Sequence, residues 1–297
     1  MGATGAVAVR ATGSAVVRAT GSVAATGLEA TTRTGAKACT GTTTRTSTAT
    51  RTGTAPRTGT ATRTGTATRT STAPRTSTAP RTVVLINPNT SATTTAMMTA
   101  IARWTLGPAL PVRGVTVARG PRMLTDPAAL RAAAPEVLAA GAAATTEGDC
   151  AALLVAAFGD PGLEAMRAAT GLPVAGLGEA ALLEAAADGA PFGIATTTPL
   201  LADALTARVT ELGLSDRYTG LRLTAGAPER LSADPPLLLD RLERAVRACA
   251  ERDGARTVVI GGGPLGEAAE ELRARCAVRI VAPIPAACRA LARLLTE

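Results

Sequence analysis

Residues 83–91 read VVLINPNTS, and this stretch decides the class of fold. Its four leading apolar residues, three of them β-branched, predict a short buried strand. The Asn, Pro, Thr and Ser residues that follow form turns and cap helices, so the chain is expected to turn from strand into helix at this point. Residues 93–104, TTTAMMTAIARW, then read as that helix.

The same strand-then-helix unit recurs to the end of the chain, about seven times in all. Further strands are expected at 113–120, 150–158, 172–176, 192–198, 221–226, 257–263 and 278–283, with a helix after each. Strands that read as continuous apolar runs and alternate with helices are typical of parallel sheets covered on both faces. The sequence therefore predicts an α/β fold from about Val83 onwards.

Residues 1–82 differ from the rest in composition. They consist largely of Ala, Thr, Gly, Arg and Ser, and from Arg45 to Arg81 an arginine recurs every six residues. Such a segment cannot bury enough apolar surface to offset its ordering entropy, so we expect a disordered low-complexity tail. Ten arginines and Lys37 against Glu29 give the tail a charge of +10, whereas the remainder carries −2. Nucleic acid is therefore not an expected partner, except for weak binding through this tail.

Composition also excludes several kinds of site. The protein has no histidine, which removes a Ser-His-Asp triad and the commonest metal ligand. Its five cysteines are scattered without zinc or disulfide spacing, so no metal and no cofactor are expected, and a cytoplasmic location is the simplest interpretation. No apolar run is long enough for a membrane helix.

Four of the expected strands end in small polar residues or glycines immediately before a helix. In parallel sheets, ligands bind at the carboxyl ends of strands, where helix N-termini present free N–H groups. We therefore expect one shared cleft for a small ligand, and its candidate binding residues are Asn87, Asn89, Ser91, Phe158, Gly159, Thr196, Thr197 and Gly263. For each junction taken alone, a simple turn and helix cap is the competing interpretation.

At this point the sequence resembles the aspartate/glutamate/hydantoin racemase family. The resemblance rests on INPNTS (86–91), FGDPGL (158–163), PVAGLGEA (173–180), FGIATTT (192–198) and VVIGGGPLG (258–266), in that order. It implies two pseudo-symmetric Rossmann-like lobes with the site between them. The implied boundaries are residues 83–186 plus 277–297 for the first lobe and 187–276 for the second.

The family's chemistry implies two cysteines, one from each lobe, that pass a proton on and off the substrate's α-carbon without a cofactor. Here Ala157 and Gly262 occupy the positions of those cysteines. The candidate acids or bases that remain are Asp160 and Glu179, each of which is equally suited to cap a helix. The cysteines that are present are expected to be buried small apolar residues.

Two interpretations therefore stay open. The first is a racemase or isomerase, or a lyase on a small carboxylate, that acts on an amino-acid- or hydantoin-like substrate with impaired proton chemistry. The second is a non-catalytic or accessory protein that kept the cleft for a small carboxylate, amide or hydantoin ligand. No membrane partner is expected, and a homo-oligomer is compatible with both.

Overall fold

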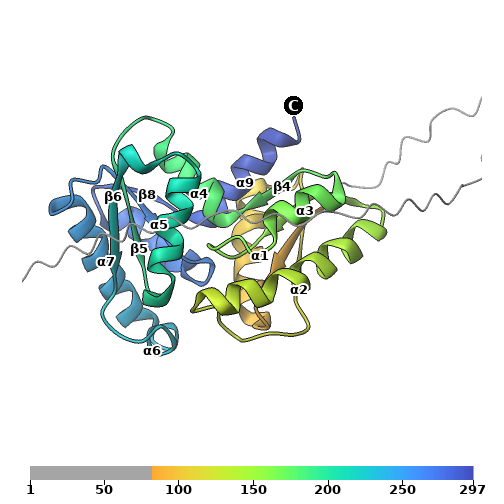
Figure 1. Ribbon diagram of the computed structural model, residues 1–297, viewed down its shortest axis with the longest axis horizontal. Coiled ribbons are helices and arrows are strands. Elements are labelled where there is room, and N and C mark those ends of the chain that lie inside the picture. The colour runs from red at the N-terminus through yellow and green to blue at the C-terminus, as the bar shows by residue number, and fades with distance from the viewer. Residues whose placement is uncertain (1–81, 297) are drawn as a thin grey trace, which may run out of the picture. The chain divides into compact units, whose positions relative to one another are not determined.

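Figure 1 shows a computed structural model of the protein, which describes residues 82–296. The predictions for the repeat tail fall outside these residues, because only Thr82, the last residue of the tail, is described. The remaining chain forms two separate parallel sheets, each of four strands, and this confirms the predicted α/β fold. A strand occurs at each place where the sequence predicts one.

Both sheets repeat one strand order, in which the first strand lies between the second and the third and the fourth lies outside the third. The order is β2-β1-β3-β4 in one sheet and β6-β5-β7-β8 in the other. The strands are β1 (Thr82–Asn87), β2 (Val112–Thr116), β3 (Cys150–Val155), β4 (Val174–Gly176), β5 (Phe192–Thr196), β6 (Tyr218–Leu223), β7 (Thr257–Ile260) and β8 (Arg279–Val281). The two halves are therefore alike in topology, as the resemblance implied.

The central strands are apolar because helices cover both of their faces. Val83 to Ile86 in β1 and Leu153 to Val155 in β3 have no exposed surface. Full burial of a Val, Leu or Ile side chain stabilises the fold by about 1.5–3 kcal/mol. The edge strand β6 is half-buried instead, which fits its more polar sequence YTGLRL.

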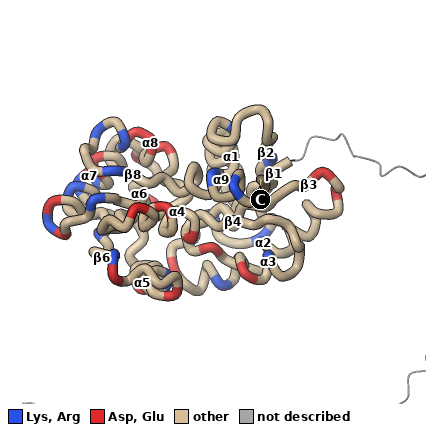
Figure 2. The backbone as a smooth tube through the Cα atoms, turned by 90° about the horizontal axis from the view of Figure 1, so that it is seen from above, with Lys and Arg blue, Asp and Glu red and all other residues tan. Residues whose placement is uncertain are grey.

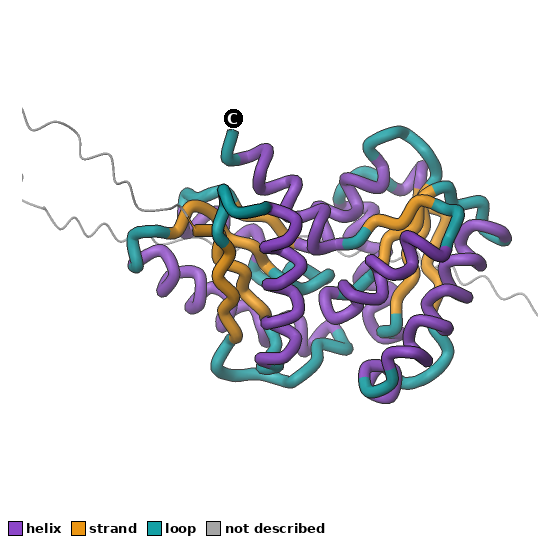
Figure 3. Tube along the Cα trace, turned by 180° about the vertical axis from the view of Figure 1, so that it is seen from behind, coloured by secondary structure: helices purple, strands orange, loops and turns teal. Residues whose placement is uncertain are grey.

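Helices lie on both sides of each sheet, as Figure 3 shows. They are α1 (Ala92–Leu106), α2 (Pro127–Thr146), α3 (Leu163–Thr170), α4 (Leu177–Ala186), α5 (Ala202–Glu211), α6 (Pro228–Ser232), α7 (Pro235–Glu251), α8 (Gly266–Arg275) and α9 (Pro283–Leu294). Local capping fixes where several of them start. Ser91 accepts the N–H of Thr94 at the start of α1, and Asp126 accepts the N–H of Ala129 at the start of α2.

The chain passes between the halves twice. Helix α4 leads from the first sheet into β5, and after β8 the chain returns as α9, which packs on α1 and α4. The lobe boundaries at residues 186 and 277 stay a prediction. Within residues 277–297, however, β8 pairs with β7 in the second sheet, and it is α9 that packs against the elements of the first half.

Acidic and basic residues are interspersed over the described surface, with no large region of a single sign in the view of Figure 2. Many of them pair one helical turn apart, as Arg247 does with Glu243. No helix among residues 82–296 has the length and apolar character needed to cross a bilayer.

Candidate active site

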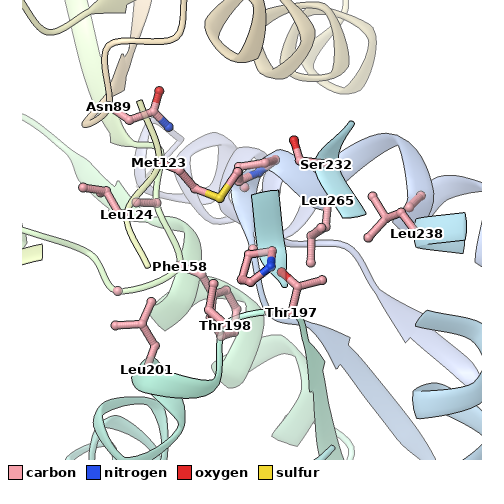
Figure 4. Close-up of a pocket in the computed structure, with 18 of the residues that line it drawn as sticks. Asn89, Met123, Leu124, Phe158, Thr197, Thr198, Leu201, Ser232, Leu238 and Leu265 are labelled. Atoms are coloured by element: carbon pink, nitrogen blue, oxygen red, sulfur yellow. The ribbon is translucent and has the colours of Figure 1, made fainter. Parts of the chain in front are cut away.

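The carboxyl ends of the central strands of both sheets border one cavity of about 240 Å³, shown in Figure 4. Each of the four junctions expected to form a cleft contributes to its wall. They supply Asn89 after β1, Ala156 to Gly159 after β3, Thr197 and Thr198 after β5, and Gly261 to Gly263 after β7.

At the junction after β1, some polar groups hydrogen-bond within the loop and one faces the cavity. Asn87 is fully buried, and its Nδ2 donates to Asn89 Oδ1 at 2.9 Å and to Thr95 Oγ1 at 3.0 Å. Asn89 Oδ1 also accepts the N–H of Ser91 at 2.9 Å, while the Ser91 hydroxyl caps α1. Asn89 Nδ2 makes no hydrogen bond within the described chain, and Asn89 lines the cavity although only 5% of it is exposed. Of the three predicted binding residues here, Asn89 alone lines the cavity, and its Nδ2 is free to donate to a ligand.

At the junction after β5 as well, one polar residue holds the loop and another faces the cavity. The buried hydroxyl of Thr196 donates to the carbonyl of Gly261 at 2.7 Å and so ties the ends of β5 and β7 together. Thr197 lines the cavity, is 8% exposed, and its hydroxyl has no hydrogen-bond partner among the residues described. Thr196 therefore builds the site, and Thr197 faces it.

Ala157 and Gly262 line the same cavity from opposite halves of the chain. The residues beside them are in contact, because a Cβ added to Gly263 would lie only 3.2 Å from the carbonyl oxygen of Ala156. Gly262 itself has an extended backbone with φ 173°, which any residue can adopt. A Cβ there would meet Leu265 at 3.0 Å, so a larger side chain requires a small movement of that leucine.

Phe158 and Gly159 complete the first-half wall of the cavity. Phe158 is 6% exposed and packs with Leu182, Phe192 and Leu201 in a single apolar cluster. The ring thus anchors the loop after β3 to the core beneath β5. A Cβ on Gly159 would lie 2.5 Å from Leu130, so this position has no room for a side chain unless that leucine moves.

Asp160 ends the loop that begins at Ala157, and it is not one of the residues that line this cavity. Its N–H donates to the carbonyl of Ala157 at 3.0 Å, while its Oδ1 and Oδ2 accept the N–H groups of Gly178 and Glu179 at 2.9 and 2.7 Å. The residue therefore caps α4, a helix that starts 17 positions later, and not α3, which directly follows it. Burial raises the pKa of Asp160 to about 6, against the lowering effect of the two N–H donors and of Arg208.

Glu179 also lies outside the cavity lining and is engaged by two arginines. Arg167 of α3 approaches one of its oxygens at 2.6 Å, and Arg208 of α5 approaches the other at 2.7 Å. Its side chain is 15% exposed. Because Arg208 comes from the second half, this carboxylate ties the two halves together.

The four cysteines within the described chain are all free and none lines the cavity. Burial raises the pKa of Cys249 to about 11 and that of Cys288 to about 12, so neither forms a thiolate near neutral pH. Cys150 lies at the start of β3, at the opposite end from the cavity, and Cys276 follows α8. No group of three His, Cys, Asp or Glu in residues 82–296 is placed to hold a metal ion.

Much of the cavity wall comes from residues that the sequence did not single out. They lie in the loop before α2, on α5 to α8 and in the turn before α8, and include Met123, Leu124, Leu205, Ser232, Leu238, Leu239, Leu265, Glu267 and Glu271. In Figure 4, Met123 and Leu124 lie on the side of Asn89, while Leu238 and Leu265 lie across from them. No local pattern marks these residues, because their place in the wall depends on how the helices pack.

Comparison with known proteins settles the family. The family model for Asp/Glu/hydantoin racemases matches residues 83–291, which is most of the chain. The chain belongs to the Asp/Glu/hydantoin racemase family. The resemblance seen in the sequence is thereby confirmed, and the match begins where the low-complexity tail ends.

Individual racemases of known name are similar over the same region. Hydantoin racemase from Paenarthrobacter aurescens is 27% identical over 70% of this chain and 88% of its own length. The structure of allantoin racemase from Klebsiella pneumoniae is 27% identical, covers 72% of this chain and 87% of its own, and superposes with a TM-score of 0.68. The structure of arylmalonate decarboxylase shares the fold. It is 22% identical, covers 72% of this chain and 92% of its own, and superposes with a TM-score of 0.51.

Proposed function

We propose that the cavity binds a small ligand with a neutral cyclic amide ring of the hydantoin kind, and that proton exchange at the ligand's α-carbon is slow. Membership of the family supports a racemase or isomerase function in general. The relatives named for hydantoin and allantoin suggest the ligand class. One observation carries the proposal. The strand ends that line the cavity offer free hydrogen-bond donors, on Asn89 and Thr197, but no side chain that can act as a base.

The donors suit a neutral ring. The amide nitrogen of Asn89 can donate to a ring carbonyl, and the Thr197 hydroxyl can donate or accept. Among the described residues, no arginine or lysine lines the cavity, so no cationic side chain there pairs with the two carboxylates of aspartate or glutamate. A carboxylate that loses its water shell without a cationic partner is strongly disfavoured.

The bases are missing at the positions where α-proton chemistry in this family would need them. Removal and return of an α-proton on opposite faces requires a proton acceptor on one side and a donor on the other. The methyl group of Ala157 and the hydrogen of Gly262 can be neither. Asp160 and Glu179 are bound to backbone N–H groups and to arginines outside the cavity lining, so we assign them structural roles.

A second candidate is a protein that binds this ligand and performs no chemistry. It is favoured by the absence of any ionisable side chain from the four strand-end segments of the cavity wall within the described chain. Deuterium incorporation at the α-carbon of 5-methylhydantoin in heavy water separates the two candidates. Incorporation above the buffer rate indicates residual catalysis, and the buffer rate alone indicates a binding protein.

The ligand class itself is tested by calorimetric titration of the full chain with 5-methylhydantoin. Asn89→Asp keeps the two hydrogen bonds that Oδ1 accepts and replaces the free donor with an acceptor, so binding should weaken about threefold to tenfold. Thr90→Ala, in the same loop but outside the cavity lining, is the matched control and should bind as the unchanged protein does. Absence of binding by the unchanged protein would refute the proposal.

A further inference from the structure

The charged side chains of the cavity wall within the described chain are all acidic. Two charged residues are part of the lining within residues 82–296, and both are acidic: Glu267 and Glu271 of α8. They lie one helical turn apart on the same face of that helix. The wall therefore has an acidic end, and the lining residues within this range include no arginine or lysine.

The two carboxylates are not equally free. Glu271 forms an ion pair with Arg275, one turn further along α8. Glu267 is exposed, and it makes no ion pair or hydrogen bond with any described residue. An exposed carboxylate without a cation beside it is open to a positive group on a bound ligand.

Apolar residues line the cavity from both halves, and one group of them lies on the same half of the chain as these acids. Leu238 and Leu239 of α7, together with Leu265 and Ala268, line the cavity next to α8. The free donors, Asn89 and Thr197, come from strand ends instead and are more than nine-tenths buried. Figure 4 shows the amide nitrogen of Asn89 turned toward Met123 in the cavity wall. A ligand whose polar ring meets these donors can direct an alkyl substituent along the leucines toward Glu267 and Glu271.

We propose that the cavity selects ligands whose substituent is an alkyl chain ending in a cation. This inference rests on the proposed function, because it assumes a ring bound at Asn89 and Thr197. The alkyl stem would pack against leucine side chains, and the terminal ammonium or guanidinium would reach the two glutamates. A long basic side chain combines an apolar stem and a charged end in just this way.

The test is calorimetric titration of the full chain with three hydantoins of similar size: 5-(4-aminobutyl)hydantoin, 5-butylhydantoin and 5-(2-carboxyethyl)hydantoin. Each exposed charge pair typically changes affinity by roughly twofold to fivefold. We therefore expect the aminobutyl compound to bind about tenfold more tightly than the butyl compound, and the carboxyethyl compound to bind most weakly. High salt should shrink the difference by screening.

The variant E267Q/E271Q should reduce the tenfold preference for the aminobutyl compound over the butyl compound to about twofold or less. Glu270→Gln is the control, since it removes one negative charge from the same helix at a residue outside the cavity lining. It should keep the preference. Equal binding of the butyl and aminobutyl compounds by the unchanged protein would overturn this inference alone. Failure of all three to bind would overturn the proposed function as well.

Discussion

Replacing Asp160 with asparagine should produce a stability change whose size depends on pH. The Asp160 carboxylate is buried and accepts the N–H groups of Gly178 and Glu179 at the start of α4. Asparagine can accept one of these with its oxygen, but its NH₂ group would face the other donor. A buried donor left without an acceptor costs about 1–3 kcal/mol.

The pH dependence follows from the raised pKa. Burial raises the pKa of Asp160 from 3.8 to about 6 in the folded protein, so folding favours the protonated acid. The stabilisation from this proton is fully present below pH 3.8 and is lost as the pH rises through about 6. Between pH 5 and pH 7.5 the loss amounts to about 1.4 kcal/mol. Asparagine cannot titrate, so the substitution should cost about 1.4 kcal/mol more at pH 5 than at pH 7.5.

The assay is urea unfolding of the unchanged protein and of Asp160→Asn at the two pH values. The difference between the two proteins removes the contribution of every other titrating group. Asp234→Asn, at the exposed N-cap of α7, is the matched control for a capping carboxylate that is not buried. A cost that is larger at pH 7.5 would refute the reasoning, because it would mean that the two N–H donors outweigh burial and keep the pKa low.

Further predictions concern the cavity, the contact between the halves, and the tail. The double substitution Ala157→Cys and Gly262→Cys should raise the rate of α-carbon deuterium exchange of 5-methylhydantoin by at least about 10²-fold, because positioned acid–base groups typically contribute about 10²–10⁴-fold each. The rate is measured by NMR in heavy water, and an unchanged rate would contradict the proposed proton path. Arg208→Met should lower the free energy of unfolding by about 1 kcal/mol in denaturant titration, since its partly exposed pair with Glu179 is lost. Gly263→Val should weaken calorimetric binding of the same hydantoin, because its Cβ would press on Met98 and on the Ala156 carbonyl. A chain that starts at Thr82 should keep the melting temperature of the full chain, and a large drop would show that the repeats contribute to stability.

Local sequence was enough to predict most of the fold. The β-branched run at residues 83–86, the Ser91 cap and the apolar strand at residues 150–155 each determine their own element, because pattern and capping act over a few residues. The short helix α6 (Pro228–Ser232) was not predicted, since five residues carry too little periodicity to show. The position of β8 beside β7 depends on pairing between distant segments, which no local signal encodes.

The candidate site was predictable in part. The rule that ligands bind at the carboxyl ends of parallel strands pointed to four junctions, and the structure brings residues from each of them to one cavity. Within a junction, however, the sequence could not tell which polar side chains hold the loop and which face the ligand. Asn87 and Asn89 look equivalent in sequence, yet the donors of Asn87 are satisfied and that of Asn89 is free. The partners of Asp160 lie 18 and 19 residues away, beyond the reach of any capping pattern.

The return of α9 to the first half bears on how the protein is made. Ile284 and Leu291 of this last helix belong to the same apolar cluster as Leu85 and Met98, which are synthesised near the start of the folded region. During translation that cluster stays open on one side until α9 has left the ribosome. Exposed apolar surface of this kind is prone to aggregate.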